Sequence, residues 1–383
     1  MTKKTSIKFE IEHIDPLGQG VFKDEEDIYF ISGTLPSEKG VANVDRFKKN
    51  IYFGHLEQES NLQEHSSKRV TPECPHFFSC NGCHFLHTSY ENELTFKEKS
   101  LERMLQQYNK NTKGGPTTEI HVHSSSKRLG YRNRIQLHYD LNTKLIGFIG
   151  FDKRKITPVP DCKILMPKLE EKLKEIYKDN HWLSLVPRSS PKKGHVELII
   201  NSQGEVNLVF NGPYAHGGFT QVHRQMNTHL QKLVFEIFKY TEHKQVLDLF
   251  GGSGNLSKRL SPTPCIVIDN HQEGLLVEWD GHQRFVKSNL YSNKAPDFVK
   301  DHYKEDTFVI LDPPRSGLKN LKDFLPETSK TISGFVYVSC NPQTFFRDIK
   351  TIRNNYVLKE IHLLDLFPST YHFEVLGVLK PTE

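Results

Sequence analysis

Between residues 245 and 340, four short apolar runs each end on turn or polar residues. They read "QVLDLFGGSGN", "PCIVIDN", "DTFVILDPPRSGL" and "GFVYVSCNP", with connections of helix length between them. Such runs indicate a parallel, doubly wound sheet of the α/β class. In sheets of this class, ligands bind outside the carboxyl ends of the strands. The residues that end each run are therefore the first candidates for chemistry.

The last of these runs ends on a thiol, Cys340, followed by Asn341 and Pro342. A free cysteine is usually a small hydrophobe in a core. At the end of a parallel strand, however, it is also where an enzyme of this class would place a nucleophile. The stretch alone favours the core interpretation, and the remaining motifs reverse that preference.

The first run leads into a glycine-rich turn, with Asp248 at the strand end followed by Gly251, Gly252 and Gly254. Glycines let a ligand approach the backbone, and we expect a helix N-terminus to follow. The spacing fits neither the dinucleotide fingerprint nor a Walker loop. The second run ends in Asp269, placed to accept hydrogen bonds from ribose hydroxyls. Together these features favour S-adenosylmethionine, with a purely structural turn as the alternative.

The third run ends on Asp312, and two prolines and Arg315 follow it. The prolines stiffen the loop and fix the aspartate at the carboxyl edge. Enzymes that methylate amino groups often carry an aromatic residue at this point to stack on the base. Arg315 therefore argues against adenine-N6 chemistry.

Methylation of uracil carbon 5 would use these residue types. A thiolate that adds to carbon 6 makes carbon 5 nucleophilic, and a base must later remove the carbon-5 proton. Cys340 supplies the thiol. Glu374 lies in a downstream apolar run between Phe373 and Val375, where a carboxylate is costly to bury without a function or a partner. The alternative is an outward-facing residue of an edge strand.

Four motifs in this order, "LDLFGGSGN", "LDPPRSGL", "VSCNPQTFFRD" and "LFPSTYHFEV", resemble the RNA uracil-5 methyltransferase family. The resemblance covers most of the chain. It implies Cys340 as the nucleophile, Glu374 as the general base and Asp312 as a hydrogen-bonding partner of the uracil edge. The element "GGFTQV" resembles the family's aromatic-x-Gln motif, which implies that Phe219 and Gln221 help to place the base and the cofactor.

The resemblance also implies the residues that bind S-adenosylmethionine. They are Gln221, Phe250, Gly252, Asp269 and Asp312. Two departures from the family pattern stand out. The glycine loop reads Gly-Gly-Ser-Gly in place of Cys-Gly-x-Gly, and the stretch between Asp269 and Asn289 is short and irregular where the family usually has a full helix. The adenine side of the cofactor site, including Asn289, is the part most affected.

Three of the six cysteines crowd into "CPHFFSCNGCHFLH", and a fourth stands alone far downstream. Clustered thiols in a long chain without a disulfide framework suggest a metal or cluster site. The spacing resembles the iron–sulfur site of the ribosomal-RNA branch of the family, which implies a [4Fe–4S] cluster. Its ligands would be Cys74, Cys80, Cys83 and Cys162.

Zinc is the alternative occupant of this site, with His76, His84 or His87 as possible substitute ligands. Cys265 lies within an apolar run, so we expect it in the core.

The first 60 residues predict a small β-barrel, because short strands alternate with turn residues. The stretch "YFISGTLPSEKGVANV" resembles the family's OB-like RNA-binding domain, called TRAM. Residues 106–225 contain 19 Lys or Arg against 10 Asp or Glu, which fits a phosphate-bearing partner or a plain lysine-rich surface. The stretch "RLGYRNRIQLH" resembles the family's basic segment. The predicted RNA contacts are Lys127, Arg128, Tyr131, Arg132 and Arg134.

We therefore expect three domains in an α/β protein. They are a TRAM-like OB-fold over 1–60, a β-rich central domain with the iron–sulfur site over 61–222, and a Rossmann-like methyltransferase domain over 223–383. The expected function is S-adenosylmethionine-dependent formation of 5-methyluridine in RNA, most favourably 23S ribosomal RNA. The polar N-terminus and the lack of a long apolar run predict a cytoplasmic protein without a membrane or an obligate protein partner.

Two alternatives stay open at this point. The same chemistry would serve transfer RNA, and a non-catalytic iron–sulfur RNA-binding protein could retain a degenerate methyltransferase domain.

Overall fold

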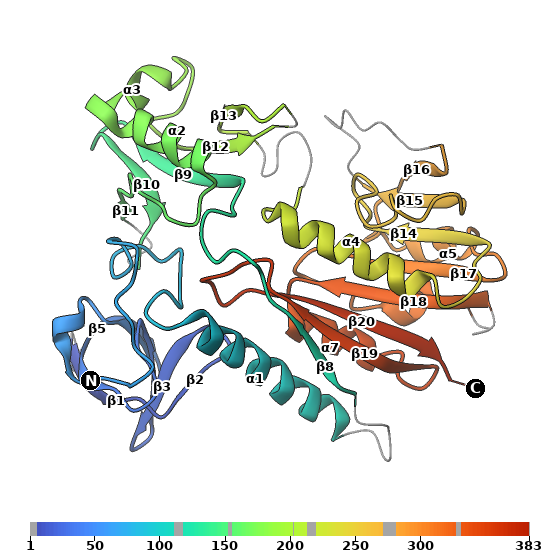
Figure 1. The fold of residues 1–383 in the computed structure, drawn as a ribbon, viewed down its shortest axis with the longest axis horizontal. Coiled ribbons are helices and arrows are strands. Elements are labelled where there is room, and N and C mark those ends of the chain that lie inside the picture. Colours follow the sequence, from blue (N-terminus) through green and yellow to red (C-terminus); the bar gives the residue numbers. More distant parts are fainter. Residues whose placement is uncertain are drawn as a thin grey trace. The chain divides into compact units, whose positions relative to one another are not determined.

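The structure is a computed structural model that describes residues 6–110, 118–151, 155–201, 203–212, 220–270, 281–326 and 331–382. The chain forms two compact units, and their elements are labelled in Figure 1. Unit 1 comprises Met1–Ser100, Ser126–Pro213 and Phe367–Tyr371. Unit 2 comprises Leu101–Ser125, Tyr214–Leu366 and His372–Glu383. Among the described residues, no helix is both long enough and apolar enough to cross a membrane.

Unit 1 begins with a seven-stranded sheet in the order β1-β5-β6-β4-β3-β2, with β7 paired to β5. Alternating apolar residues make these strands, and Phe9, Tyr29 and Ile31 lie in the core that they enclose. The strands are β1 (Ser6–Glu10), β2 (His13–Ile14), β3 (Gln19–Asp24), β4 (Asp27–Ser32), β5 (Lys39–Lys48), β6 (Ile51–His55) and β7 (Leu62–Glu64), and a short 3-10 helix, η1 (Glu59–Asn61), precedes β7.

The second sheet of unit 1 is antiparallel, in the order β11-β10-β9-β12-β13. Helix α2 begins with Pro167 and buries Leu169, Leu173 and Ile176, which recur at helical spacing. The elements are β9 (Arg134–Asp140), β10 (Leu145–Ile149), β11 (Ile156–Thr157), α2 (Pro167–Tyr177), η2 (Lys178–Asn180), α3 (Trp182–Leu185), β12 (Lys193–Ile200) and β13 (Val206–Phe210). The sequence pattern of residues 120–210 predicts mainly strands with one helix near 167–178, and the structure confirms this.

Unit 2 is built on an eight-stranded sheet in the order β16-β15-β14-β17-β18-β20-β19-β8. The first five strands are parallel, β20 is antiparallel to both β18 and β19, and β8 is parallel to β19. The strands are β8 (Ile120–His123), β14 (Gln245–Leu249), β15 (Cys265–Asp269), β16 (Gln283–Lys287), β17 (Thr307–Leu311), β18 (Ile332–Ser339), β19 (Tyr356–Leu364) and β20 (Glu374–Pro381). The predicted α/β class is confirmed, and Cys265 is buried in β15 as expected.

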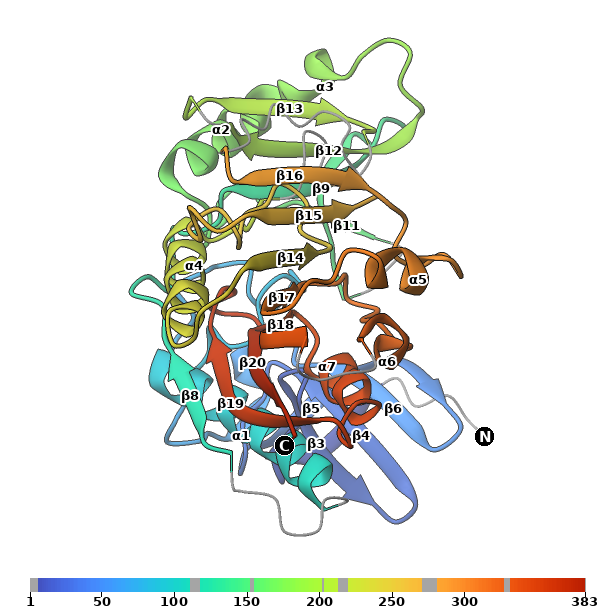
Figure 2. The same cartoon turned by 90° about the vertical axis from the view of Figure 1, so that its right-hand side faces the viewer.

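Helices cover both faces of this sheet, with α4 on one face and α5, α6 and α7 on the other (Figure 2). Leu249, Leu311 and Tyr337 point to the second face and pack with apolar residues of α5 to α7. The helices are α4 (Arg224–Phe238), α5 (Ala295–Lys300), α6 (Leu321–Phe324) and α7 (Pro342–Lys350). Helix α1 (Tyr90–Asn109) runs from unit 1 into unit 2.

One expected element is missing from unit 2. The sequence predicts a helix directly after the glycine-rich turn, but residues 252–259 form consecutive turns. Phe250, Gly252 and Gly254 all have positive φ, a conformation that a right-handed helix does not accept. No helix N-terminus therefore faces this turn.

Candidate active site

The central feature of unit 2 is the pairing of β18 with β20 at the carboxyl edge of the parallel strands. The antiparallel register pairs Val338 with Leu376 and Ser339 with Val375. Continuing that register by one residue sets Cys340 opposite Glu374, the first residue of β20. Directly opposed residues have Cβ atoms about 4.5–5.5 Å apart. Cys340 directly follows β18, and the charge of Glu374 acts on its thiol, so the thiol and the carboxylate are near one another at the edge where a ligand of this fold class binds.

Asp312 belongs to the same group of side chains. It follows β17, and its backbone N–H donates to the Leu249 carbonyl at 3.2 Å. The parallel register pairs Leu311 with Tyr337, so Asp312 falls level with Val338, on the face that also bears Cys340 and Glu374. The structure thus brings together the three residues that the sequence predicted for catalysis and uracil binding.

Burial and like charge control how these groups ionise. The pKa of Cys340 is raised to about 12, mainly by burial and then by the charges of Glu374 and Asp312, against the lowering effect of Arg315. Burial, followed by the Asp312 charge, raises the pKa of Glu374 well above its ordinary value. Its Oε2 atom is buried and has no hydrogen-bond partner among the residues that the structure describes. An acidic group held in this way can take and release a proton.

Arg315 is a further candidate for the site, and sequence reasoning did not link it to Cys340. Its side chain hydrogen-bonds the Cys340 thiol, and its positive charge favours the thiolate. The Arg315 carbonyl accepts hydrogen bonds from Asn341 Nδ2 at 3.2 Å and Thr344 Oγ1 at 3.3 Å. The arginine is visible in the sequence, but its partner belongs to another strand end and only the fold brings them together.

Asp348 of α7 holds the loop that carries Asp312 and Arg315. This fully buried carboxylate accepts from the Leu318 backbone N–H at 2.5 Å and from the Tyr337 hydroxyl at 2.7 Å. It also pairs with Arg347, whose Nη2 donates to the Ser316 carbonyl at 2.7 Å. The loop between β17 and α6 is therefore fixed from the helix that follows Cys340.

The glycine-rich turn lies one strand away, after β14. Ser257 Oγ donates to the buried Asp248 at 2.6 Å, and the Gly252 backbone N–H donates to Asp269 Oδ2 at 3.1 Å. Among the residues that the structure describes, none lies within 4 Å of a Cβ atom added at Gly252, so none of them covers this backbone. Burial raises the pKa of Asp248 to about 7. The turn joins the ends of β14 and β15 around a surface that a ligand can approach.

Gln221 precedes α4 and is buried. The neighbouring His223 caps α4 by accepting from the Met226 backbone N–H at 3.4 Å, and its Nε2 lies 2.7 Å from Ser125 Oγ. These two contacts of His223 fix the start of α4, which Gln221 precedes by three residues. Phe219, predicted with it, lies outside the described residues.

The four predicted cluster ligands lie in unit 1, and all four are free thiols. The thiols of Cys74, Cys80 and Cys162 all act electrostatically on that of Cys83, which brings the distant Cys162 to the loop that holds the other three. Across the described part of the chain, no group of three or more His, Cys, Asp or Glu side chains is arranged to hold a metal ion.

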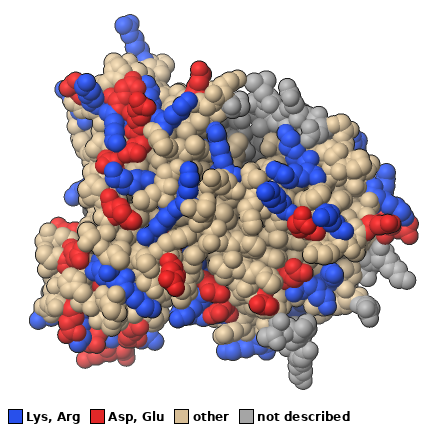
Figure 3. Space-filling model, viewed as in Figure 1, with Lys and Arg blue, Asp and Glu red and all other residues tan. Residues whose placement is uncertain are grey.

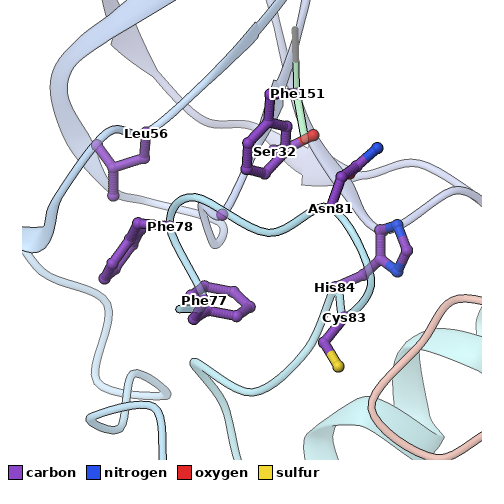
Figure 4. Close-up of a pocket in the computed structure, with 10 residues that line it drawn as sticks. Ser32, Leu56, Phe77, Phe78, Asn81, Cys83, His84 and Phe151 are labelled. Atoms are coloured by element: carbon purple, nitrogen blue, oxygen red, sulfur yellow. The ribbon is translucent and has the colours of Figure 1, made fainter. Parts of the chain in front are cut away.

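The histidines of this loop have other surroundings. His87 is buried, with its Nε2 3.3 Å from the Thr34 carbonyl, and burial lowers its pKa to about 3. His84 lines a small pocket beside Cys83 with an empty volume of about 280 Å³, part of it open solvent (Figure 4). Phe77, Phe78 and Phe151 also line it. The cysteine loop therefore has a largely aromatic environment.

The predicted RNA contacts divide into exposed and buried residues. Lys127 is exposed and Arg132 is half-buried, with its Nε donating to the Arg134 carbonyl at 2.9 Å. Arg128 pairs with Glu93 at 3.2 Å. Tyr131 is 3% exposed and Arg134 is 4% exposed. Arg134 lies 3.4 Å from the buried Glu197. Neither buried side chain presents a surface on which a base could stack.

Several lysines of unit 1 are paired with nearby acidic side chains. On helix α2 and beside it, Lys163 pairs with Asp161, Lys172 with Glu175 and Lys174 with Glu170, each at 2.8 Å. Basic and acidic side chains lie interspersed on the face shown in Figure 3. The lysine surplus of this segment is therefore only in part available to a phosphate-bearing partner.

A mixed α/β sheet, a glycine turn at a strand end and a group of ionisable side chains at the carboxyl edge fit a methyltransferase of the S-adenosylmethionine-dependent class. The model of the tRNA (uracil-5-)-methyltransferase family matches residues 288–381. The chain is 26% identical to the 23S rRNA (uracil(1939)-C(5))-methyltransferase RlmD of Vibrio parahaemolyticus, over 99% of this chain and 98% of that protein. It is 28% identical to an uncharacterized RNA methyltransferase of Nitrosomonas europaea, over 97% and 95% of the two chains.

A solved structure has the same fold. The tRNA (uracil-54, C5)-methyltransferase of Pyrococcus abyssi, in complex with S-adenosyl-L-homocysteine, has a TM-score of 0.71 and 21% identity, and the match covers 97% of this chain and 100% of that one. The chain is thus similar over nearly its whole length to RNA uracil-5 methyltransferases, and the family model covers its C-terminal quarter.

Proposed function

We propose that this protein transfers a methyl group from S-adenosylmethionine to carbon 5 of a uridine in RNA, with 23S ribosomal RNA as the substrate. The observation that carries the proposal is the placement of Cys340 opposite Glu374, level with Asp312, at the carboxyl edge of the sheet. The relatives named as 23S rRNA methyltransferases align with nearly the whole chain, which favours ribosomal RNA. We assign the enzyme to the cytoplasm, where that RNA is made and assembled.

The reaction begins at Cys340. The thiolate adds to carbon 6 of the uracil, and the electron pair of the 5,6 double bond moves towards carbon 5 and the carbonyl oxygen. Because burial disfavours the thiolate, the positive charge of Arg315 must stabilise it. Asp312 hydrogen-bonds the uracil edge and so fixes the ring above the thiol. S-adenosylmethionine supplies an electrophilic methyl group to carbon 5.

Glu374 completes the reaction. Once carbon 5 carries the methyl group, it still bears its original proton, and the covalent bond to Cys340 persists. The Glu374 carboxylate removes that proton, the double bond re-forms and the thiolate leaves carbon 6. A carboxyl group with a raised pKa is suited to this step, because its carboxylate accepts a proton more readily than an exposed one.

For S-adenosylmethionine we propose the contacts that the sequence predicted. The turn at Phe250 and Gly252 is open to a ligand, and Asp269 at the end of β15 is placed to bind ribose hydroxyls. Asp312 and Gln221 would lie towards the methyl donor. For Phe219 we retain the proposed role of placing the uracil base.

We further propose that Cys74, Cys80, Cys83 and Cys162 hold a [4Fe–4S] cluster. Four thiols without a disulfide, gathered from two distant stretches of unit 1, are the usual ligand set for such a cluster. A zinc ion is the alternative occupant, and analysis of the bound metal distinguishes the two.

For RNA binding we propose the N-terminal sheet, as a TRAM-like OB module, together with exposed basic residues of the segment after residue 126. Lys127 and Arg132 are the side chains that this segment offers, with Arg128 also engaged by Glu93. We omit Tyr131 and Arg134, because both are buried. The three-domain division at residues 60 and 222 remains part of this proposal.

Nucleoside mass spectrometry tests the function. Anaerobically purified protein is incubated with S-adenosylmethionine and with unmodified 23S ribosomal RNA or transfer RNA. New 5-methyluridine in the 23S RNA is the expected result. If it forms only in transfer RNA, the chemistry stands and the substrate assignment is wrong. If it forms in neither while the cofactor still binds, the catalytic proposal is wrong.

A further inference from the structure

The segment Phe367–Tyr371 between β19 and β20 packs within unit 1, although the strands on both sides of it belong to unit 2. The Ser369 carbonyl accepts from the backbone N–H groups of His84 at 2.7 Å and Phe85 at 3.1 Å. The Tyr131 hydroxyl donates to the Pro368 carbonyl at 2.9 Å. The segment is therefore held by hydrogen bonds from the cysteine loop and from the start of the central region.

A buried carboxylate holds the same segment from its other side. Glu93 of α1 is 0% exposed, and its Oε1 accepts from the Ser369 backbone N–H at 2.7 Å. Glu93 also pairs with Lys97 at 2.7 Å and with Arg128 at 3.2 Å. Both cations also bind the segments that Ser369 joins. Lys97 Nζ donates to the Phe367 carbonyl at 3.4 Å, and Arg128 Nη2 donates to the Phe85 carbonyl at 2.6 Å.

The position of Ser369 matters because Glu374 comes soon after it in the chain. Tyr371 is the last residue held in unit 1, and only His372 and Phe373 separate it from Glu374. Ser369 itself has a φ of 69°, a value that a non-glycine residue adopts only where its surroundings impose it. The network around Glu93 imposes that conformation just ahead of the strand that Glu374 begins.

We propose that Glu93 is a positioning residue for the general base: its buried carboxylate anchors Ser369 and so fixes where Glu374 stands when it removes the carbon-5 proton. The inference rests on the proposed function, in which Glu374 acts after methyl transfer. A displaced base leaves attack by Cys340 and methyl transfer intact, and slows only the proton removal that releases the RNA. The signature is therefore a methylated RNA that stays covalently attached to the protein.

The test uses two double variants of the full chain. In Glu93→Leu/Lys97→Met the acceptor for the Ser369 N–H is lost, and the buried charge pair is replaced by apolar groups of similar volume, a change that folded proteins tolerate better than the loss of one partner. In Glu93→Gln/Lys97→Met the charges are equally absent, but an amide oxygen remains as the acceptor. Both variants lose the charge that pairs with Arg128, so the difference between them reports the polar acceptor at position 93, which serves Ser369 and Arg128. Glu91→Gln, on an exposed position of the same helix, is the control for α1.

Single-turnover reactions on denaturing gels, with labelled RNA, separate adduct formation from release. We expect the leucine variant to form the adduct within about twofold of the wild-type rate and to release it at least about tenfold more slowly, because small misplacements of a catalytic group cost one to two orders of magnitude. The glutamine variant and Glu91→Gln should release at close to the wild-type rate. Wild-type release by the leucine variant, or equal slowing of both steps, would overturn the proposal.

A milder variant keeps the test decisive if the leucine variant does not fold. Glu93→Asp retains the charge that Lys97 and Arg128 require but withdraws the carboxylate from Ser369 by about one bond length, roughly 1.5 Å. Slow release with normal adduct formation in this variant supports the proposal, and wild-type release contradicts it. Glu374→Gln is run alongside as the reference for a failed base. If even that variant accumulates no adduct, the proposed function fails, and this inference fails with it.

Discussion

Cys340 and Glu374 lie one residue beyond Ser339 and Val375, the last pair of the ladder between β18 and β20. Glu374 begins β20 and Cys340 directly follows β18, so the nucleophile and the base of the proposed reaction both adjoin the end of this strand pair. Strand pairing fixes their separation more tightly than a loop would. The rest of the site is arranged around this pair, and each part of the arrangement can be tested.

The Arg315 guanidinium should control how readily Cys340 ionises. Because its positive charge and its hydrogen bond lower the pKa of the thiol, Arg315→Met should raise that pKa and reduce the thiolate fraction at any given pH. Alkylation of Cys340 by iodoacetamide at pH 9, followed by mass spectrometry of its peptide, should slow about tenfold or more, and Arg315→Lys should retain part of the wild-type rate. An unchanged rate in Arg315→Met would show that the arginine does not act on the thiol.

The buried Asp248 should make stability depend on pH. Burial raises its pKa from 3.8 to about 7, so the folded state binds a proton that the unfolded state releases between these values. The contribution is complete below pH 3.8 and is lost as the pH rises through about 7, on the order of 4 kcal/mol in total. Asp248→Asn cannot ionise, and its thermal melts should change less between pH 5 and pH 8. If the melting temperatures of wild type and Asp248→Asn change equally with pH, the raised pKa assigned to Asp248 is wrong.

Gly317 should resist substitution because of Asp348. Its φ is 66°, and an added Cβ would collide with the Asp348 carboxylate that holds the catalytic loop. Gly317→Ala should therefore destabilise the fold by about 1–3 kcal/mol and reduce methylation. Gly281→Ala is the matched control, since a Cβ at Gly281 meets nothing within 4 Å. Equal denaturant midpoints for the two variants would refute the steric argument.

The four thiols of unit 1 should bind iron as a set. Anaerobically purified wild-type protein should contain about four irons and four sulfides per chain, and Cys83→Ser or Cys162→Ser should lose most of both, together with the visible absorbance. Cys265→Ser, which alters a buried cysteine in β15, is the control and should retain full iron. A wild-type protein that contains zinc, or no metal after anaerobic purification, would contradict the cluster.

Sequence reasoning located the site where the signals were local. Asp312 and Cys340 end apolar runs, Glu374 lies within one, and the resemblance to a known family named all three; the structure places them near one another at one edge of the sheet. The prediction of a helix after the glycine turn was wrong. Phe250 and Gly254 have positive φ values, which the residue types alone do not reveal. Asp348 was missed for a related reason, since its partners Leu318 and Tyr337 come from other parts of the chain.

Long-range burial accounts for the other differences. Glu93 and Lys97, four residues apart on α1, have the spacing of an ordinary surface ion pair, yet both are buried against residues 367–369. Tyr131 and Arg134 sit in a basic stretch that resembled an RNA contact, but their partners Pro368 and Glu197 draw them into the interior. Residue type and spacing do not reveal such partners.

Trapping the covalent intermediate tests the central claim most directly. Glu374→Gln is incubated with S-adenosylmethionine and unmodified 23S ribosomal RNA, and the products are resolved under denaturing conditions and digested for mass spectrometry. The account predicts a stable adduct in which the Cys340 peptide is linked to a methylated uridine, and its absence when Cys340 is also changed to alanine. An adduct at another residue, or turnover by Glu374→Gln at the wild-type rate without an adduct, would contradict the roles assigned to both residues.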